Sequence, residues 1–139
     1  MKKAIFIFVV SILVLTTILS GCTDDKKAVE KEKAVDISFS SDVLELLDSN
    51  VEVREENGKI YFVEVTLYFK SLIDKTANFD YRVDFCDKYD NVLHSRPYSL
   101  LNIPANYNIA SPDVFSYDGE DTEHFDHVNV YVENYEIKS

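Results

Sequence analysis

The richest group of side chains with acid–base or metal-binding chemistry lies between Asp118 and His127. This stretch holds five carboxylates and two of the three histidines of the chain. Carboxylate oxygens and imidazole nitrogens bind divalent cations. The acidic residues lack the order of a calcium-binding loop, however, and the two histidines are three positions apart, where a zinc-binding helix has four. We therefore expect a solvated acidic loop, with a metal site formed by Asp118, Asp121, His124 and His127 as the alternative.

The rest of the chain contains no motif for catalysis. There is no G-x-S-x-G sequence and no glycine-rich phosphate loop, and the whole chain has only three glycines. The third histidine, His94, precedes Ser95-Arg96-Pro97 and has no partner that the sequence reveals. These observations predict that the protein is not an enzyme and needs no cofactor.

The position of Cys22 indicates a different kind of chemistry. It follows Leu19, Ser20 and Gly21, and this four-residue sequence resembles the lipobox of prokaryotic lipoproteins. The resemblance implies that cleavage falls before Cys22 and that its sulfur becomes a thioether to a diacylglycerol. Two acyl chains hold a protein stably at a bilayer, where one chain would hold it only marginally. We therefore expect the protein to contact the membrane through the lipid on Cys22.

The residues before Cys22 fit a signal peptide, residues 1–21. Lys2 and Lys3 precede an apolar stretch from Ala4 to Ile18. This stretch is short for a transmembrane helix, which needs about 20 residues. The alternative is an uncleaved N-terminal anchor helix in which the cysteine is incidental. Both interpretations place the rest of the chain in the cell envelope, on the extracytoplasmic side of the membrane.

The net charge excludes one class of partner. The whole chain carries a formal charge of −11, and without Lys2 and Lys3 the remaining 12 basic and 25 acidic side chains give −13. Nucleic-acid binding depends on basic residues that neutralise phosphates. The one basic pair after the leader, Lys26-Lys27, lies beside Asp24-Asp25. We expect no binding to nucleic acid, and we expect membrane attachment to come from the lipid rather than from surface charge.

The second cysteine, Cys86, is left without a partner if Cys22 is acylated. Exported proteins with two cysteines ordinarily form a disulfide. A thioether on Cys22 prevents this, so we expect a free thiol at Cys86. Cys86 lies on the outward side of an alternating segment and is expected to be only partly buried. A reactive or metal-binding sulfur is the alternative to a small residue within a strand.

The chain then changes character twice. Residues 22–36 form a charged linker of alternating sign with no apolar face to pack. From Ile37 to the C terminus, residues 37–139, apolar and polar residues alternate in the manner of half-buried strands. In Lys59–Lys70 the expected core side chains are Tyr61, Val63, Val65, Leu67 and Phe69. In Phe79–Cys86 they are Phe79, Tyr81, Val83 and Phe85.

Turn-forming residues divide this region into about seven short strands. Asn57-Gly58 predicts a two-residue hairpin between Val51–Arg54 and the strand that follows, because Asn and Gly tolerate positive φ. Further strands are expected at Val92–Ser95, Tyr98–Ile103, Asn106–Ala110 and Val128–Tyr135. A short helix at Ser40–Leu47 is the one exception, suggested by a Ser/Asp cap and helical spacing. The overall pattern is typical of an antiparallel β-sandwich.

Two turns carry a resemblance to a known family. Val83-Asp-Phe-Cys-Asp87 followed by Lys88-Tyr-Asp-Asn-Val-Leu93, and later Asn102-Ile-Pro-Ala-Asn106, resemble the FxLYD-type immunoglobulin-like domains of prokaryotic lipoproteins, which are related to late-embryogenesis-abundant type 2 domains. Phe85 and Asp87 match the family pattern. Cys86 replaces its tyrosine, and Asp90 and Ala105 stand where glycines are usual. The resemblance, over residues 44–135, implies an immunoglobulin-like sandwich without catalytic activity.

Among the tyrosines outside the expected core positions, five form a candidate binding surface: Tyr98, Tyr107 and Tyr117 in or beside loops, and Tyr131 and Tyr135 on one face of the last strand. Exposed aromatic residues mark binding surfaces, although sandwich surfaces also carry them without a ligand. The sequence therefore predicts a lipid-anchored binding or structural module whose partner is an envelope protein or a polysaccharide. The alternative is a metal-binding accessory lipoprotein that uses the Asp118–His127 loop.

Overall fold

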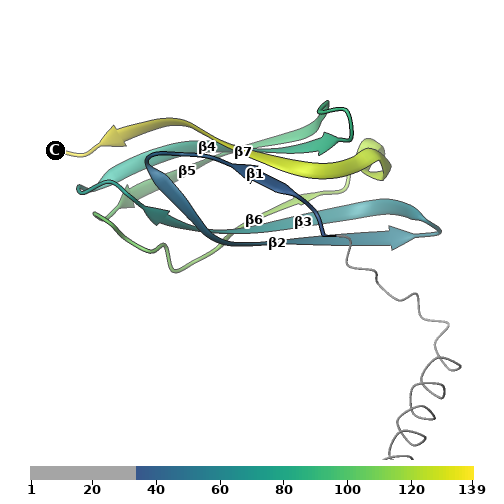
Figure 1. Ribbon diagram of the computed structural model, residues 1–139, viewed down its shortest axis with the longest axis horizontal. Helices are drawn as coiled ribbons and strands as arrows, with labels where there is room; N and C mark the ends of the chain where they lie inside the picture. Colours follow the sequence, from purple (N-terminus) through teal and green to yellow (C-terminus); the bar gives the residue numbers. More distant parts are fainter. Residues whose placement is uncertain (1–33) are drawn as a thin grey trace, which may run out of the picture. The chain divides into compact units, whose positions relative to one another are not determined.

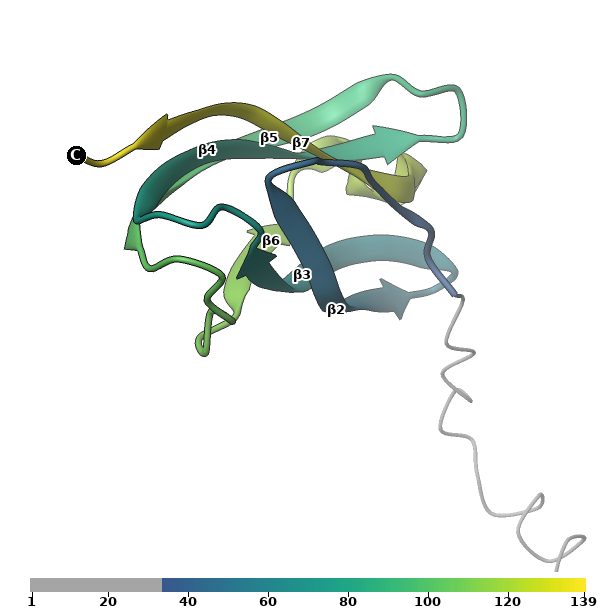
Figure 2. The ribbon, with the colours of Figure 1, turned by 60° about the vertical axis from the view of Figure 1, so that its left-hand side comes forward.

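Residues 34–139, which the computed structural model describes, form two β-sheets that lie face to face (Figures 1 and 2). The seven strands are β1 (Ile37–Phe39), β2 (Leu44–Glu56), β3 (Lys59–Ser71), β4 (Ala77–Asp87), β5 (Val92–Ile103), β6 (Asp113–Tyr117) and β7 (Phe125–Ile137), with a 3₁₀ turn η1 (Glu120–His124) before β7. The predicted all-β sandwich is confirmed. The predicted signal peptide, Cys22 and most of the charged linker lie outside the described residues.

One sheet has four strands in the order β1-β7-β4-β5, and the other has three in the order β2-β3-β6. Figure 2 shows the two layers, with β4, β5 and β7 in one and β2, β3 and β6 in the other. All pairs are antiparallel except β1 and β7, which run parallel. The chain crosses from the first sheet to the second between β1 and β2. Among the described residues, no helix is long and apolar enough to cross a bilayer.

The core lies between the sheets and follows the predicted alternation. Inward side chains of β4 and β3 are completely or almost completely buried: Phe79, Tyr81, Val83 and Phe85 on β4, and Val63, Val65, Leu67 and Phe69 on β3. Phe69 contacts Tyr81 edge to face across the two sheets, with ring centroids 5.1 Å apart. Tyr81 in turn contacts Phe115 of β6 at 5.9 Å. These aromatic contacts join the sheets through their centre.

The turn between β2 and β3 is the predicted two-residue hairpin. Asn57 and Gly58 have φ angles of 53° and 76°, so both adopt the left-handed conformation that this turn requires. Glu56 and Lys59 pair directly at its base. This short turn fixes the register of the longest strand pair among residues 34–139, in which each strand has 13 residues.

Tyr61 is an exception to the predicted core, because its side chain is 51% exposed. The pairing of β2 with β3 shifts between Arg54 and Glu55, which pair with Phe62 and Ile60 and leave Tyr61 as an extra residue. A shift of one residue reverses the faces of all residues beyond it. Ile60 consequently packs against the core in place of Tyr61.

The helix predicted at Ser40–Leu47 is wrong. The hydroxyl of Ser41 accepts hydrogen bonds from the backbone N–H groups of Val43 and Leu44, each at 3.1 Å, but the chain then continues as β2. The Ser and Asp residues therefore make a turn, which uses the same side-chain bond as a helix cap. Leu44 is buried in the core as the first residue of the strand.

Three other strand assignments change. Val92–Ser95 and Tyr98–Ile103 form one strand, β5, which continues through Pro97 because Pro97 lies on a sheet edge, where no partner needs its N–H group. The strand predicted at Asn106–Ala110 is a loop with one isolated bridge, between Asn108 and Lys70. The short strands β1 and β6 are both absent from the strands that the sequence predicts.

Cys86 points to the outer face as predicted, but it is buried, with only 1% of its surface exposed. His127 of β7 lies directly opposite, and the Asn129 amide lies 3.6 Å from the Cys86 sulfur. The Nε2 atom of His127 binds the Asp90 carboxylate at 2.8 Å, which holds the β4–β5 turn beside β7. Neighbouring side chains on the outer face therefore bury Cys86. The alternation of apolar and polar residues does not predict this burial, because the covering residues belong to another strand.

Candidate functional site

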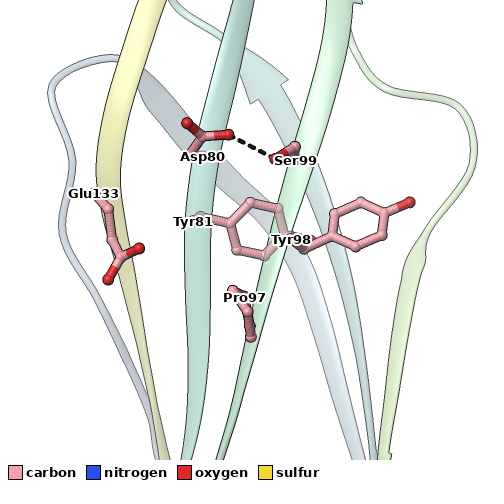
Figure 3. A pocket seen from close by; sticks show the side chains of 6 residues that line it. All are labelled: Asp80, Tyr81, Pro97, Tyr98, Ser99 and Glu133. Atoms are coloured by element: carbon pink, nitrogen blue, oxygen red, sulfur yellow. Dashed lines mark hydrogen bonds between the residues drawn. The ribbon is translucent and has the colours of Figure 1, made fainter.

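A shallow hollow of about 550 Å³ lies on the outer side of the four-stranded sheet (Figure 3). Its lining comes from three neighbouring strands: Asp80 and Tyr81 of β4, Pro97, Tyr98 and Ser99 of β5, and Glu133 of β7. Asp80 pairs with Ser99 across β4 and β5, and the Ser99 hydroxyl donates a 2.6 Å hydrogen bond to the Asp80 carboxylate. The hollow therefore presents carboxylate and hydroxyl oxygens on a rigid sheet.

Glu133 reaches this hollow because β7 has an extra residue at that point. The pairing with β4 passes from Val132 directly to Asn134, which leaves Glu133 without a cross-strand partner. Its carboxylate binds the Nη1 atom of Arg82 at 2.5 Å. The irregularity in β7 thus places a second acidic side chain on the strand next to that of Asp80, as Figure 3 shows.

Arg82 connects the hollow to a buried carboxylate. Its Nε atom lies 2.9 Å from an oxygen of Asp84, which also accepts a 2.6 Å hydrogen bond from the Ser95 hydroxyl. Asp84 is 97% buried, so these bonds compensate for its lost hydration. The guanidinium group of Arg82 also lies 5.1 Å from the centre of the Tyr131 ring. This network holds Arg82 in place and leaves it paired with acids.

The hollow is suited to binding rather than to covalent chemistry. No histidine or cysteine lines it, and a serine hydroxyl becomes a nucleophile only beside a suitable base. The nearest thiol on the same face, Cys86, has a pKa above its usual value, first because of burial and then because of the Asp84 and Asp90 charges. A raised pKa disfavours the reactive thiolate. The geometry fits polar or cationic groups.

The five predicted surface tyrosines do not form one patch. Tyr98 is 45% exposed and packs edge to face on Tyr81 and Phe115. Tyr131 lies on the outer face beneath Arg82, whereas Tyr135 pairs with Phe79 and belongs to the opposite face, because the extra residue Glu133 reverses the alternation. Tyr107 is an exposed residue of the β5–β6 loop.

Tyr117 is a correction to the predicted surface, since it is buried in the core. It is the last residue of β6 and faces inward opposite Val63. Its ring stacks on His94 with a centroid distance of 4.9 Å and an interplanar angle of 6°. A side chain added at Gly119 would meet the Tyr117 ring at 2.5 Å, so the backbone passes too close for any other residue. The sequence predicts Tyr117 at the surface because it does not predict β6, the strand that turns this side chain inward.

His94, for which the sequence reveals no partner, therefore packs against aromatic side chains at the edge of the core. Besides Tyr117, it lies near Phe85, with ring centroids 6.1 Å apart. Burial, and then the charge of Arg96, lower the pKa of His94 below its usual value. The neutral ring is the form that packs well against aromatic neighbours. The sequence signal for this contact, a histidine at an inward position of β5, appears only once the register is known.

The four residues of the predicted metal site do not converge on one point, because the two histidines among them contact different partners. His127 lies between two carboxylates, with Nε2 2.8 Å from Asp90 and Nδ1 3.0 Å from Asp126. His124 lies in η1, and its Nε2 atom is 3.8 Å from Glu123. Asp118 and Asp121 are exposed. Throughout residues 34–139, no three His, Cys, Asp or Glu side chains come together closely enough to hold a metal ion.

We predict that the Asp118–His127 loop does not form a specific metal site. A site in the Asp118–His127 loop would bind the native state alone and raise the melting temperature with the logarithm of free metal. We expect no such rise in thermal unfolding with micromolar zinc, nickel or calcium. A saturable rise that disappears in both His124→Ala and Asp121→Ala, and persists in the control Glu136→Ala, would contradict this expectation.

Comparison of the chain with models of known protein families, with curated proteins and with solved structures finds no match.

Proposed function

We propose that this protein is a lipid-anchored, extracytoplasmic binding or structural module without catalytic activity. The observation that carries the proposal is Leu19-Ser20-Gly21-Cys22 at the end of a short apolar leader. Lipid attachment at Cys22 gives a strongly acidic protein a membrane contact that its surface charge does not provide. The partner is an envelope protein or a polysaccharide. Recovery of the protein in membranes washed with high salt, and its release by detergent, test this anchor.

The β4–β5 turn supports membership in the FxLYD-type immunoglobulin-like domains. Asp87, which matches that pattern, accepts hydrogen bonds from the N–H groups of Tyr89 and Asn91 at 2.8 and 2.9 Å and so closes the turn. Asp90, which replaces the usual glycine, has a φ of 64° and adopts the conformation that a glycine would take. Near the second turn, Asn102 and Asn106 have positive φ angles, whereas Ala105 does not.

The contacts of the described residues favour a binding module over catalysis or over metal binding by the Asp118–His127 loop. The hollow on the outer face is shallow, its carboxylates are bound to Ser99 and Arg82, and no histidine lines it. The alternative of a metal-binding accessory lipoprotein requires Asp118, Asp121, His124 and His127 to converge, and the contacts of these residues do not favour it. We therefore place the binding module first.

A further inference from the structure

Of the four sheet edges among the described residues, β2 is the one open to another strand. The edge strands are β1 and β5 in one sheet and β2 and β6 in the other. The strands β1 and β6 have only 3 and 5 residues, and β5 contains Pro97 and two register shifts. Short length, proline and irregular pairing are the features that protect an edge from added strands. The strand β2 has 13 residues and no proline. Its pairing with β3 also has two register shifts, but the extra residue of the second shift is Tyr61 of β3, so Leu47 is the one extra residue in β2 itself.

An apolar groove lies beside the first part of this edge. It has a volume of about 690 Å³ and is formed where the chain passes from β1 to β2, with Ile37, Phe39, Leu44, Leu46 and Leu72 as its apolar lining. Leu47, the extra residue of β2, is also exposed. Strand addition typically combines main-chain hydrogen bonds with pockets for alternate side chains. The edge of β2 and this groove provide both in adjacent positions.

The charges of β2 select the kind of strand. The strand carries five carboxylates, on Glu45, Asp48, Glu52, Glu55 and Glu56, and a single cation, Arg54, which is already bound to Glu52 at 2.6 Å. Glu52 also lies directly opposite Glu64 of β3, and like charges at such positions repel. A second copy of this chain would bring two acidic strands together. A strand with lysine or arginine side chains would neutralise them.

We propose that the free edge of β2 binds an extended, basic segment of an envelope protein as an added β-strand. Backbone groups of β2 pair with the segment, its basic side chains meet Asp48 and Glu52, and apolar side chains near one end enter the groove at Leu46. This inference rests on the proposed function and names the partner class of the binding module. It concerns the sandwich alone, so its failure would leave the lipid anchor untouched.

The experiment uses the full protein purified in detergent and a labelled peptide in which lysine and valine alternate. The peptide is 13 residues long, which is the length of β2. We expect saturable binding by fluorescence anisotropy. Two control peptides separate the contributions: one alternates lysine and proline, which keeps the charge but cannot pair as a strand, and the other alternates glutamate and valine. We expect both to bind at least tenfold more weakly. Equal binding of the lysine–proline peptide would reduce the effect to charge and overturn the proposal.

Protein variants locate the site. The double variant Asp48→Lys/Glu52→Lys is expected to weaken peptide binding at least tenfold, whereas Asp118→Lys/Glu136→Lys makes the same change of net charge elsewhere and is expected to weaken it less than threefold. Amide hydrogen exchange should slow in β2 when the peptide binds. Equal losses in the two double variants, or no protection in β2, would contradict strand addition there.

Two other occupants of the edge are outcomes of the same experiment. Dimers in sedimentation equilibrium that dissociate in Asp48→Lys/Glu52→Lys would assign the edge to a second copy. The described residues belong to a compact unit that spans Glu32–Ser139. If a chain that begins at Glu32 binds the peptide at least tenfold more tightly than the full protein, the edge belongs to the protein's own N-terminal residues. Either result would overturn a basic envelope segment as the partner.

Discussion

Replacing Cys22 with serine is expected to abolish both lipid attachment and cleavage of the leader. A serine hydroxyl cannot form the thioether that attaches diacylglycerol, and cleavage before residue 22 depends on that modification in the lipoproteins that the Leu19–Cys22 sequence resembles. In a lipidated protein the acyl chains contribute about 0.8 kcal/mol per buried methylene, so a variant without them keeps only the contact that its uncleaved leader makes. We expect Cys22→Ser to accumulate with its leader and to lose the mature lipidated form from the detergent phase of a phase-separating detergent.

The second cysteine provides the matched control. Cys86→Ser also removes one thiol, but it leaves Cys22 unchanged and should partition into detergent like the wild type. The uncleaved leader of Cys22→Ser is itself apolar, so electrophoretic mobility must be read together with the partitioning. A Cys22→Ser protein that is processed to the mature size and partitions into detergent like the wild type would be incompatible with a lipid anchor.

Replacing Tyr81 with alanine is expected to produce the largest loss of stability within the sandwich. Tyr81 is fully buried, and its ring contacts Phe69, Tyr98 and Phe115. Removing a large buried ring costs about 3–5 kcal/mol, which lowers the melting temperature of a domain this size by more than about 10 °C. Tyr61→Ala is the matched control, because the alternating pattern places both tyrosines in the core. Since Tyr61 is exposed, we expect its replacement to cost less than about 1 kcal/mol.

Tyr81→Phe separates the hydroxyl from the ring. The Tyr81 hydroxyl donates a hydrogen bond to Asp113 of β6, and this bond joins the two sheets. Burial raises the pKa of Asp113, and the Tyr81 bond opposes that rise. Without the hydroxyl we expect a loss of about 1–3 kcal/mol at neutral pH. A raised pKa means that the folded protein holds the proton more tightly, so stability falls as the pH rises above the unfolded pKa. The loss in Tyr81→Phe should therefore be smaller at acid pH, as measured by urea unfolding.

Equal losses of stability in Tyr81→Ala and Tyr61→Ala would contradict the assignment of faces in this core. A loss of stability in Tyr81→Phe that does not change with pH would show that the pKa of Asp113 does not depend on the Tyr81 hydroxyl.

The sequence predicts the strands whose alternation is long and regular, because one face of such a strand must be buried. This is why the burial of β4 and most of β3 follows from the pattern alone. The errors at Tyr61 and Tyr135 come from single extra residues in β3 and β7, which reverse the faces beyond them. Such irregularities depend on the partner strand and leave no local signal. The short strands β1 and β6 are too brief for a periodic pattern.

The candidate sites show the same limit. The sequence does not predict the outer hollow, because Asp80, Ser99 and Glu133 belong to three different strands. Only the pairing register of those strands brings the three residues together. The burial of Cys86 likewise depends on His127 and Asn129 across the sheet. By contrast, the lipobox resemblance is carried by four consecutive residues. This difference explains why the sequence predicts the localisation of the protein more directly than it predicts a ligand.

The most direct measurement is intact-mass and peptide mass spectrometry of the protein purified from membranes of the organism that makes it. A lipid anchor predicts a mature chain that begins at Cys22, with a diacylglyceryl group in thioether linkage on that residue and a free thiol on Cys86. A chain that retains Met1, or one in which Cys22 is unmodified or disulfide-linked to Cys86, would contradict it.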